Sequence, residues 1–266
     1  MTMSFLLHDS LSELDPTDIM AAADLSPGKK GGSHGSRVTV IEDKLKIPQL
    51  GNVTSRKRLL DLLCRSTEQY GATLISGRAG TGKTALAAEY ARQTKNSSWI
   101  TIEPADSDWR EFSAAFSACL FGSGRGRSAT IAEEPDDAGV SKYLTECFSR
   151  LAKHKRPATK LIVLDNVHHL FDARWFADFF RQLIISLNEN IRLLMLCRST
   201  PSAPLWRLRS KQMLNVIDEN LLDLTDDEAM DICRMRGISD SRTKDALNRS
   251  YRRVSAFLKE LDRAAG

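Results

Sequence analysis

Short apolar runs alternate with longer segments of helical periodicity along most of this 266-residue chain. The runs have the length of β-strands and fall at 72–76, 98–103, 160–165, 191–197 and 212–217. The helix-like segments fall at 55–66, 82–95, 108–121, 140–154 and 173–187. Such alternation is typical of a mostly parallel sheet with helices on both faces. The pattern therefore predicts an α/β fold.

The N-terminal region departs from this pattern. Residues 1–25 hold five acidic residues and no Lys or Arg, and residues 25–37 are rich in Gly, Ser and Pro. Such a composition buries too little apolar surface to offset the entropy lost on ordering. We therefore expect residues 1–37 to form a flexible tail and linker, with a short amphipathic helix over residues 5–25 as the alternative. Residues 122–139, rich in Gly and polar residues, are expected to form an exposed loop.

The last part of the chain is expected to be entirely helical. Thr225 and Glu228 have the spacing of a capping box, which starts a helix. Gly237 is placed to end that helix. A second helical stretch, over residues 240–263, finishes the pattern.

A glycine-rich loop joins the first predicted strand to the helix after it. Its sequence, GRAGTGKT, is the Walker A pattern in its strand–loop–helix context, and this pattern binds the phosphates of ATP or ADP. The glycines let backbone N–H groups point into one concavity, and the helix N-terminus adds positive charge. The lysine reaches the β- and γ-phosphates, and the last threonine offers its hydroxyl to Mg²⁺. The predicted binding residues are Gly77, Arg78, Ala79, Gly80, Thr81, Gly82, Lys83 and Thr84.

A carboxylate that completes the Mg²⁺ site is expected at the end of another strand, because open α/β sheets bind ligands at the carboxyl ends of their strands. Asp165 ends the third apolar run and is interpreted as the Walker B aspartate, the second metal ligand beside Thr84. Asn166 follows, where many ATPases have an acidic residue that polarises the attacking water. An amide orients water but takes no proton, so we expect slow hydrolysis, with His168 and His169 as nearby candidates to assist.

The overall composition limits the partners and the cellular compartment that we expect for the protein. The formal net charge is only +4, which predicts no strong general attraction to nucleic acid or to an anionic membrane. The five cysteines lack metal-ligand spacing and mostly lie among apolar residues, as reduced thiols of a cytosolic protein do. No apolar run approaches the ~20 residues that span a membrane, and the start of the chain lacks the basic region of a secretory signal. We expect a cytoplasmic location without membrane contact.

Five segments outside the Walker A loop carry a wider pattern. In chain order they are DKLKIP with Arg56 after it, SSWITIEPADSDWREFSAAF, VLDNVHHL, LLMLCRSTPSAPLWRLR and LLDLTDDEAMDI. Together they resemble the P-loop NTPase domain of the STAND class, in the branch typified by the maltose-regulon transcription activator. The resemblance covers roughly residues 43–260. Asp165 and His168 match the family's Asp-Asp-x-His segment, and Asn166 departs from it.

The resemblance implies a fold and a division into domains. The P-loop NTPase core would occupy residues 38–220, with a five-stranded parallel sheet in which strand 191–197 lies between the two Walker strands. A helical lid, residues 221–266, would cover the nucleotide. Arg56 would lie near the nucleotide pocket. Arg198, at the carboxyl edge of the sheet, would sense the γ-phosphate and join Asp165 and Asn166 as a candidate catalytic residue.

The resemblance also implies a switch. In this family the ADP form is closed, and inducer together with ATP opens it for self-association. The chain has no recognisable segment for inducer sensing or for sequence-specific DNA binding. We therefore expect a stand-alone or shortened relative, or a protein partner that supplies those functions.

Three functions stay open at this point. The first is a regulatory ATP/ADP switch of the STAND type. The second is an AAA-type ATPase that assists a DNA transaction such as transposition, and salt-dependent DNA binding would favour it. Its candidate phosphate contacts are Arg207, Arg209, Lys211, Arg252 and Arg253. The third is a module that holds ADP without turnover and serves as a scaffold.

Overall fold

A computed structural model describes residues 42–51, 54–122, 134–153, 159–201 and 205–265. The chain divides into two units, residues 1–37 and residues 38–266. The predicted tail, the linker and the alternative amphipathic helix lie outside the described residues. The fold below is that of the second unit.

A five-stranded sheet forms the centre of this unit, as the sequence predicts. Its strands are β1 Ala72–Ser76, β2 Ser97–Thr101, β3 Lys160–Asp165, β4 Ile191–Cys197 and β5 Leu214–Ile217. Each pair of neighbouring strands is parallel, and the order is β2-β3-β4-β1-β5. The strand before the Walker A loop, β1, is thus separated by β4 from the strand that ends at Asp165, β3. This is the order that the family resemblance implies.

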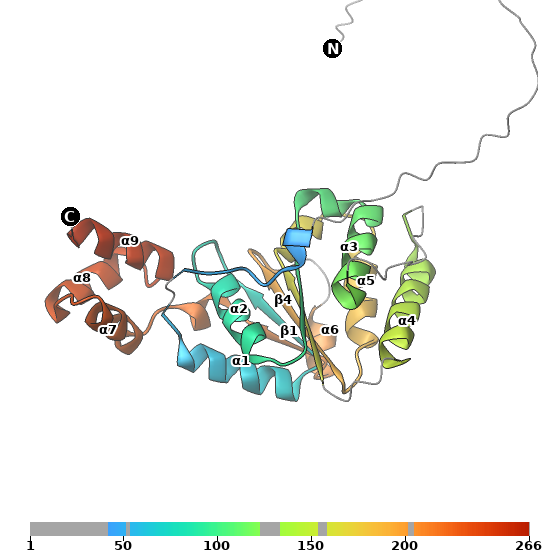
Figure 1. The fold of residues 1–266 in the computed structure, drawn as a ribbon, viewed down its shortest axis with the longest axis horizontal. Coiled ribbons are helices and arrows are strands. Elements are labelled where there is room, and N and C mark those ends of the chain that lie inside the picture. The colour runs from blue at the N-terminus through green and yellow to red at the C-terminus, as the bar shows by residue number, and fades with distance from the viewer. Residues whose placement is uncertain (1–41, 52–53, 123–133, 154–158, 202–204, 266) are drawn as a thin grey trace, which may run out of the picture. The chain divides into compact units, whose positions relative to one another are not determined.

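Helices cover both faces of the sheet (Figure 1). They are α1 Lys57–Gln69, α2 Lys83–Gln93, α3 Trp109–Phe121, α4 Asp137–Lys153, α5 Phe176–Ile185 and α6 Leu205–Ser210. α1 and α2 share one core with strand residues Ile75, Val163 and Leu194. α3, α4 and α5 share the other core with Leu74 and Ile162. Since successive side chains of a strand point to opposite faces, the same strands supply both cores.

Short 3-10 turns connect several of these elements. They are η1 Glu42–Leu45, η2 Pro104–Ser107, η3 Val167–Leu170 and η4 Glu219–Leu222. η3 directly follows the Walker B strand, and η4 directly precedes the helical end of the chain. Both turns contribute to the site described below.

The helical end forms a small subdomain with its own core. Its helices are α7 Asp226–Met235, α8 Asp240–Arg249 and α9 Val254–Ala265, which pack around buried Ile232, Leu247 and Phe257. The predicted capping box is confirmed, because Thr225 and Glu228 each accept a hydrogen bond from the other's backbone N–H. Gly237 follows the end of α7 with a φ of 67°, as predicted.

Three sequence predictions need correction. The predicted helical stretch 240–263 is two helices, because the chain turns at Tyr251 and Arg252, whose φ values of 51° and 59° are left-handed. Residues 137–139, predicted as loop, already belong to α4. The last strand begins at Leu214 rather than residue 212. Neither glycine nor proline marks the turn between α8 and α9, so the pattern gave no sign of it.

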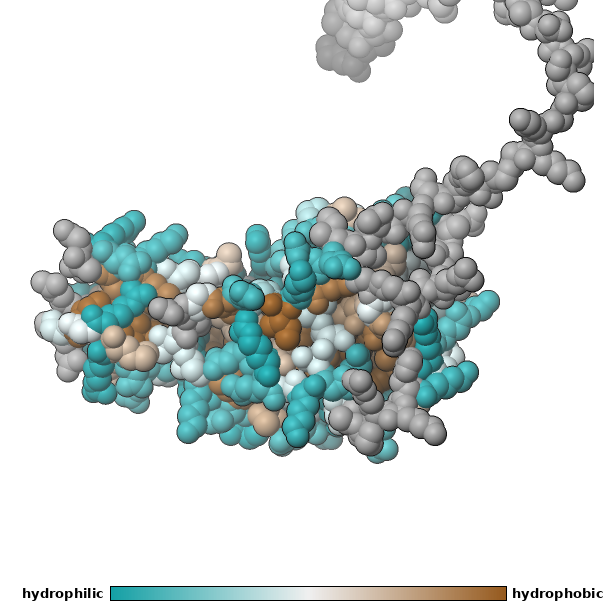
Figure 2. Space-filling view, in the orientation of Figure 1, coloured by the Kyte–Doolittle hydropathy of each residue, from teal (hydrophilic) through white to brown (hydrophobic). Residues whose placement is uncertain are grey.

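The described surface is mostly hydrophilic on the face shown in Figure 2. The large apolar side chains that are exposed belong to different elements and are Ile185, Trp206, Leu221, Met235 and Tyr251. Of the cysteines, Cys64 is exposed and the other four are buried. Across the described ranges, no helix combines the length and the apolar character needed to cross a membrane.

Candidate functional site

Residues predicted to act together lie at one edge of the sheet. β1 ends at Ser76 beside Cys197, the last residue of β4, and β3 ends at Asp165 on the far side of β4. Because these strands are parallel, their carboxyl ends meet at the same edge. The Walker A loop after β1, Asp165, and Arg198 after β4 therefore share that edge.

The Walker A loop has the backbone conformation that its glycines predict. Gly80 and Gly82 have φ values of 85° and 89°, a region that residues with a Cβ avoid. A Cβ on Gly77 would lie 3.3 Å from side-chain atoms of Glu219 and Leu222, closer than an ordinary contact, so these side chains would have to shift slightly. α2 begins directly after the loop at Lys83, so the unpaired N–H groups of its first turn adjoin the loop.

Lys83 folds back into the loop. Its Nζ donates to the carbonyl oxygens of Gly77 and Arg78, the latter at 2.9 Å, and the residue is buried. Burial lowers the pKa of the Lys83 ammonium, although the field of Asp165 acts in the opposite direction. The ammonium is held by carbonyl oxygens that phosphate oxygens can replace. This arrangement fits an anionic ligand on the loop.

Thr84 and Asp165 form the pair of oxygen donors expected for Mg²⁺. The Thr84 hydroxyl donates to the Asp165 carboxylate at 3.1 Å, and the backbone N–H of Asn166 donates to it at 2.9 Å. Burial raises the pKa of Asp165, against the effect of these hydrogen bonds. No group of three or more His, Cys, Asp or Glu side chains suits a metal in the part of the chain that the structure describes. A hydroxyl and one carboxylate fit Mg²⁺, which takes its other ligands from phosphate and water.

Replacing Asp165 tests this pairing. Asp165→Asn should weaken Mg²⁺-dependent ATP binding by about ten- to a hundredfold, because the ligand set loses its charge. ADP binding without Mg²⁺ should stay unchanged, and so should both affinities in Asp61→Asn, an exposed position on α1. Calorimetry with and without Mg²⁺ measures the difference. Equal losses under both conditions would show that Asp165 is structural.

Asn166 has a backbone conformation that the sequence did not reveal. Its φ and ψ of 61° and 35° lie in the left-handed region, where asparagine is among the best-tolerated residues with a side chain. The half-buried side chain follows the buried carboxylate of Asp165. Asparagine therefore suits the backbone at this point, and its role in orienting water stays a prediction.

The helical subdomain touches the Walker A loop directly. The backbone N–H of Ser255, in the first turn of α9, donates to the carbonyl oxygen of Gly80 at 3.1 Å. A Cβ on Gly80 would lie 2.0 Å from the Ser255 hydroxyl oxygen, so a larger residue there would force the Ser255 side chain to move. The subdomain is thus in direct contact with the phosphate loop, and we refer to it as the lid.

Arg56 joins the core to the same lid. Its guanidinium donates to the carbonyl oxygens of Leu222 at 2.7 Å and Asp223 at 2.8 Å, and to the Glu228 carboxylate at 2.7 Å. Burial acts to raise the pKa of Glu228, but hydrogen bonds from Arg56 and Arg58 outweigh it, and the pKa lies below its usual value. The resemblance places Arg56 near a nucleotide pocket. In the structure, its guanidinium N–H groups donate to acceptors of the lid and of the turn before it.

Truncating Arg56 should loosen the lid. Arg56→Ala removes the buried guanidinium that pairs with Glu228 and leaves the Leu222 carbonyl oxygen without this donor, whereas Arg58 still donates to Glu228 and to the Asp223 carbonyl oxygen. We expect a loss of about 2–3 kcal/mol in unfolding free energy. Arg58→Ala is the matched control, because the exposed Arg58 also bonds Glu228 and its loss should cost less than about 1 kcal/mol. Since the Glu228 pKa is lowered, the difference should be full at neutral pH and shrink below about pH 4.5. Urea unfolding of both variants checks this, and equal losses would contradict it.

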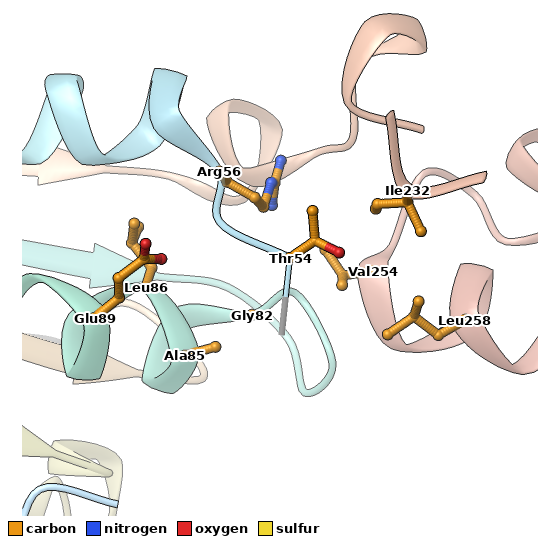
Figure 3. A pocket seen from close by; sticks show the side chains of 9 residues that line it. All are labelled: Thr54, Arg56, Gly82, Ala85, Leu86, Glu89, Ile232, Val254 and Leu258. Atoms are coloured by element: carbon orange, nitrogen blue, oxygen red, sulfur yellow. The ribbon is translucent and has the colours of Figure 1, made fainter. Parts of the chain in front are cut away.

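A mostly apolar pocket lies between α2 and the lid (Figure 3). Its lining residues are Thr54, Arg56, Gly82, Ala85, Leu86, Glu89, Ile232, Val254 and Leu258. Gly82 belongs to the Walker A loop, so the pocket adjoins the place where phosphates are expected. Apolar walls with a few polar groups are typical of sites for small molecules.

Sequence reasoning missed three residues of this site. Glu219 accepts hydrogen bonds from the backbone N–H of Arg78 at 3.1 Å and from its guanidinium at 2.7 Å. Ser255 contacts Gly80, and Glu228, read only as a helix cap, also holds Arg56. The capping box was the one signal available in the sequence. Arg198 is exposed and has no hydrogen bond or ion pair within the described residues.

The strand order, the Walker A loop after β1 and Asp165 after β3 together define a P-loop NTPase of the α/β class. The family model for the AAA ATPase domain matches residues 54–197, more than half of the chain, and the chain belongs to this family. The resemblance to STAND-class domains is also confirmed, by the relatives that follow.

The relatives include transcription regulators. The HTH-type transcriptional regulator MalT of Serratia proteamaculans is 27% identical over 211 residues, which are 78% of this chain and 23% of the relative. That of Klebsiella pneumoniae is 27% identical over 202 residues, 74% of this chain and 22% of the relative. This chain thus spans less than a quarter of the length of either regulator.

Among solved structures, the fold resembles a STAND protein with a tetratricopeptide repeat sensor from Pyrococcus horikoshii. The match has a TM-score of 0.53 and 17% sequence identity, and it covers 78% of this chain and 29% of that one. At this level of identity the likeness shows a shared fold.

Proposed function

We propose that this domain is a regulatory switch that binds ATP or ADP with Mg²⁺ and signals through the position of its lid. The observation that carries the proposal is the hydrogen bond from Ser255 of the lid to Gly80 of the phosphate loop. Because this hydrogen bond joins the lid to the loop that would bind the phosphates, a ligand that shifts the loop would also shift the lid. Regulation by MalT relatives supports the same reading.

Each part of the site has a role in this proposal. The backbone of residues 77–84 and the Lys83 ammonium hold the phosphates, and the pocket beside Ala85 and Val254 holds the base. Thr84 and Asp165 hold Mg²⁺, which neutralises phosphate charge when bound. Arg198 meets the γ-phosphate from the end of β4. The lid packs over the loop and excludes water.

Slow turnover is part of the proposal. Asn166 occupies the position from which a carboxylate would take a proton from the attacking water. An amide orients the water without accepting its proton. The nucleotide state would then persist long enough to serve as a signal, which is what a switch requires and a motor does not.

The test is the nucleotide content, turnover and size of the purified protein. We expect bound ADP or ATP, very slow hydrolysis, and different elution on gel filtration with ADP and with a non-hydrolysable ATP analogue. The difference would reflect self-association or an opened lid, in a protein that we place in the cytoplasm and that works on itself or on a protein partner. A chain that binds neither nucleotide, or that hydrolyses ATP briskly with unchanged elution, would refute the proposal.

One observation favours the DNA-transaction alternative. Trp206 on α6 is 66% exposed, and the guanidinium of its neighbour Arg207 lies 5.2 Å from its ring centroid. An aromatic side chain among basic ones suits stacking on single-stranded nucleic acid. Fluorescence anisotropy with labelled DNA over a salt series distinguishes the two. Tight, salt-dependent binding that falls in Trp206→Ala would favour the alternative.

A further inference from the structure

His168 lies in η3, three residues after Asp165, and both of its ring nitrogens, Nδ1 and Nε2, are buried without a hydrogen-bond partner among the described residues. The ring of His169 lies against it, with the ring centroids 4.3 Å apart. Buried polar atoms in folded proteins are nearly always paired. An apolar ring would fill the same space without leaving two polar atoms unpaired.

The His168 imidazole is neutral in this setting. Burial lowers the pKa of His168 to about 4, and the charges of His169, Arg198 and Lys83 act in the same direction. A neutral imidazole has one N–H donor and one acceptor nitrogen. It can therefore donate to an oxygen and accept from water at the same time.

The surroundings of η3 indicate where a partner would come from. Lys83 and Arg198, whose charges reach His168, belong to the loop–helix junction and to the end of β4. Both lie at the edge of the sheet where phosphates are expected. η3 also packs on η2, where the buried Asp106 carboxylate is already paired with Lys44 at 2.6 Å. The N–H of the neutral His168 ring lacks a hydrogen-bond acceptor among the described residues, and the nearest proposed source of one is a phosphate oxygen of the nucleotide.

We propose that His168 is a specificity-determining residue that distinguishes a nucleoside triphosphate from a diphosphate. Its N–H donates to an oxygen of the third phosphate group, and its other nitrogen accepts from the water beside that group. A diphosphate lacks this oxygen and gives the ring no such partner. The proposal rests on the proposed nucleotide site and deepens it, because it names a group that, in addition to Arg198, distinguishes the two nucleotide states.

The test compares two nucleotides on matched variants. His168→Phe keeps a ring against His169 and removes both nitrogens, whereas His169→Phe is the control at the adjacent position. We expect His168→Phe to weaken binding of a non-hydrolysable ATP analogue by about tenfold or more, the loss of one hydrogen bond to a charged oxygen. ADP affinity should stay within about twofold. His168→Gln, which restores a donor, should recover part of the loss.

A second readout separates this role from a structural one. Because the ring nitrogens have no partner in the described residues, His168→Phe should leave the nucleotide-free unfolding midpoint unchanged or raise it. A lowered midpoint, or equal losses for both nucleotides, overturns the inference. If Lys83→Ala abolishes binding while His168→Phe has no effect, this inference fails and the nucleotide site stands. If the native protein binds neither nucleotide, both fail.

Discussion

Lys83→Ala should reduce the affinity for both ATP and ADP by about a hundredfold or more, with little change in stability. The ammonium supplies charge-assisted hydrogen bonds to phosphate oxygens, each worth about 1.5–3 kcal/mol. Stability should persist because burial already disfavours this charge, as the lowered pKa of Lys83 shows. Calorimetry with each nucleotide and urea unfolding without nucleotide measure the two effects.

Two variants control this result. Lys83→Met keeps most of the buried length and should lose affinity just as Lys83→Ala does, which separates charge from packing. Lys57→Ala removes an exposed lysine at the start of α1 and should bind nucleotide normally. Unchanged affinity in Lys83→Ala would show that the phosphate site lies elsewhere.

Asn166→Asp should increase the rate of ATP hydrolysis by about a hundred- to ten-thousandfold, the usual contribution of a general base. Nucleotide affinity should be unaffected, because Lys83 and the loop hold the phosphates. Aspartate is the right substitution, since φ at this position is 61° and aspartate tolerates the left-handed region nearly as well as asparagine. Single-turnover hydrolysis on the native chain and the variant gives the ratio.

Asn166→Glu is the informative comparison. It brings the same charge but tolerates the left-handed backbone less well, so we expect a gain in rate together with some loss of stability. Asn166→Ala should show no gain. If native hydrolysis is brisk and both acidic variants leave it unchanged or slower, another residue prepares the water and the protein works as a motor.

The sequence predicted what depends on local pattern. Strand-length apolar runs gave the sheet, and the Walker A loop with Asp165 gave the core of the candidate site, because each rests on neighbouring residues. The strand order came from the family resemblance. The assignment of nucleotide contacts stays a prediction, which the Lys83 and Asp165 variants test.

The rest depends on contacts between distant residues, which a single sequence does not display. Ser255 meets Gly80, and Arg56 meets Glu228, only because the tertiary fold brings the lid into contact with the core. The backbone is left-handed at Asn166, Tyr251 and Arg252, and none of these is a glycine, so the sequence did not indicate this conformation. In the sequence, Asn166 departs from the family's Asp-Asp-x-His segment. In the structure, it is also a residue type that tolerates the left-handed backbone at this position.

The short turn η4 has a thermodynamic consequence. Glu219 at its start bonds Arg78 in the phosphate loop, and the carbonyl of Leu222 at its end accepts from Arg56, which holds the lid at Glu228. Coupling free energy between two binding events is reciprocal, and it commonly amounts to about 1–3 kcal/mol. If a ligand on the loop favours one lid position by some factor, any protein that captures that lid position tightens the ligand by the same factor. A protein that binds the lid would therefore change the nucleotide affinity by the same factor by which the nucleotide changes the affinity for that protein.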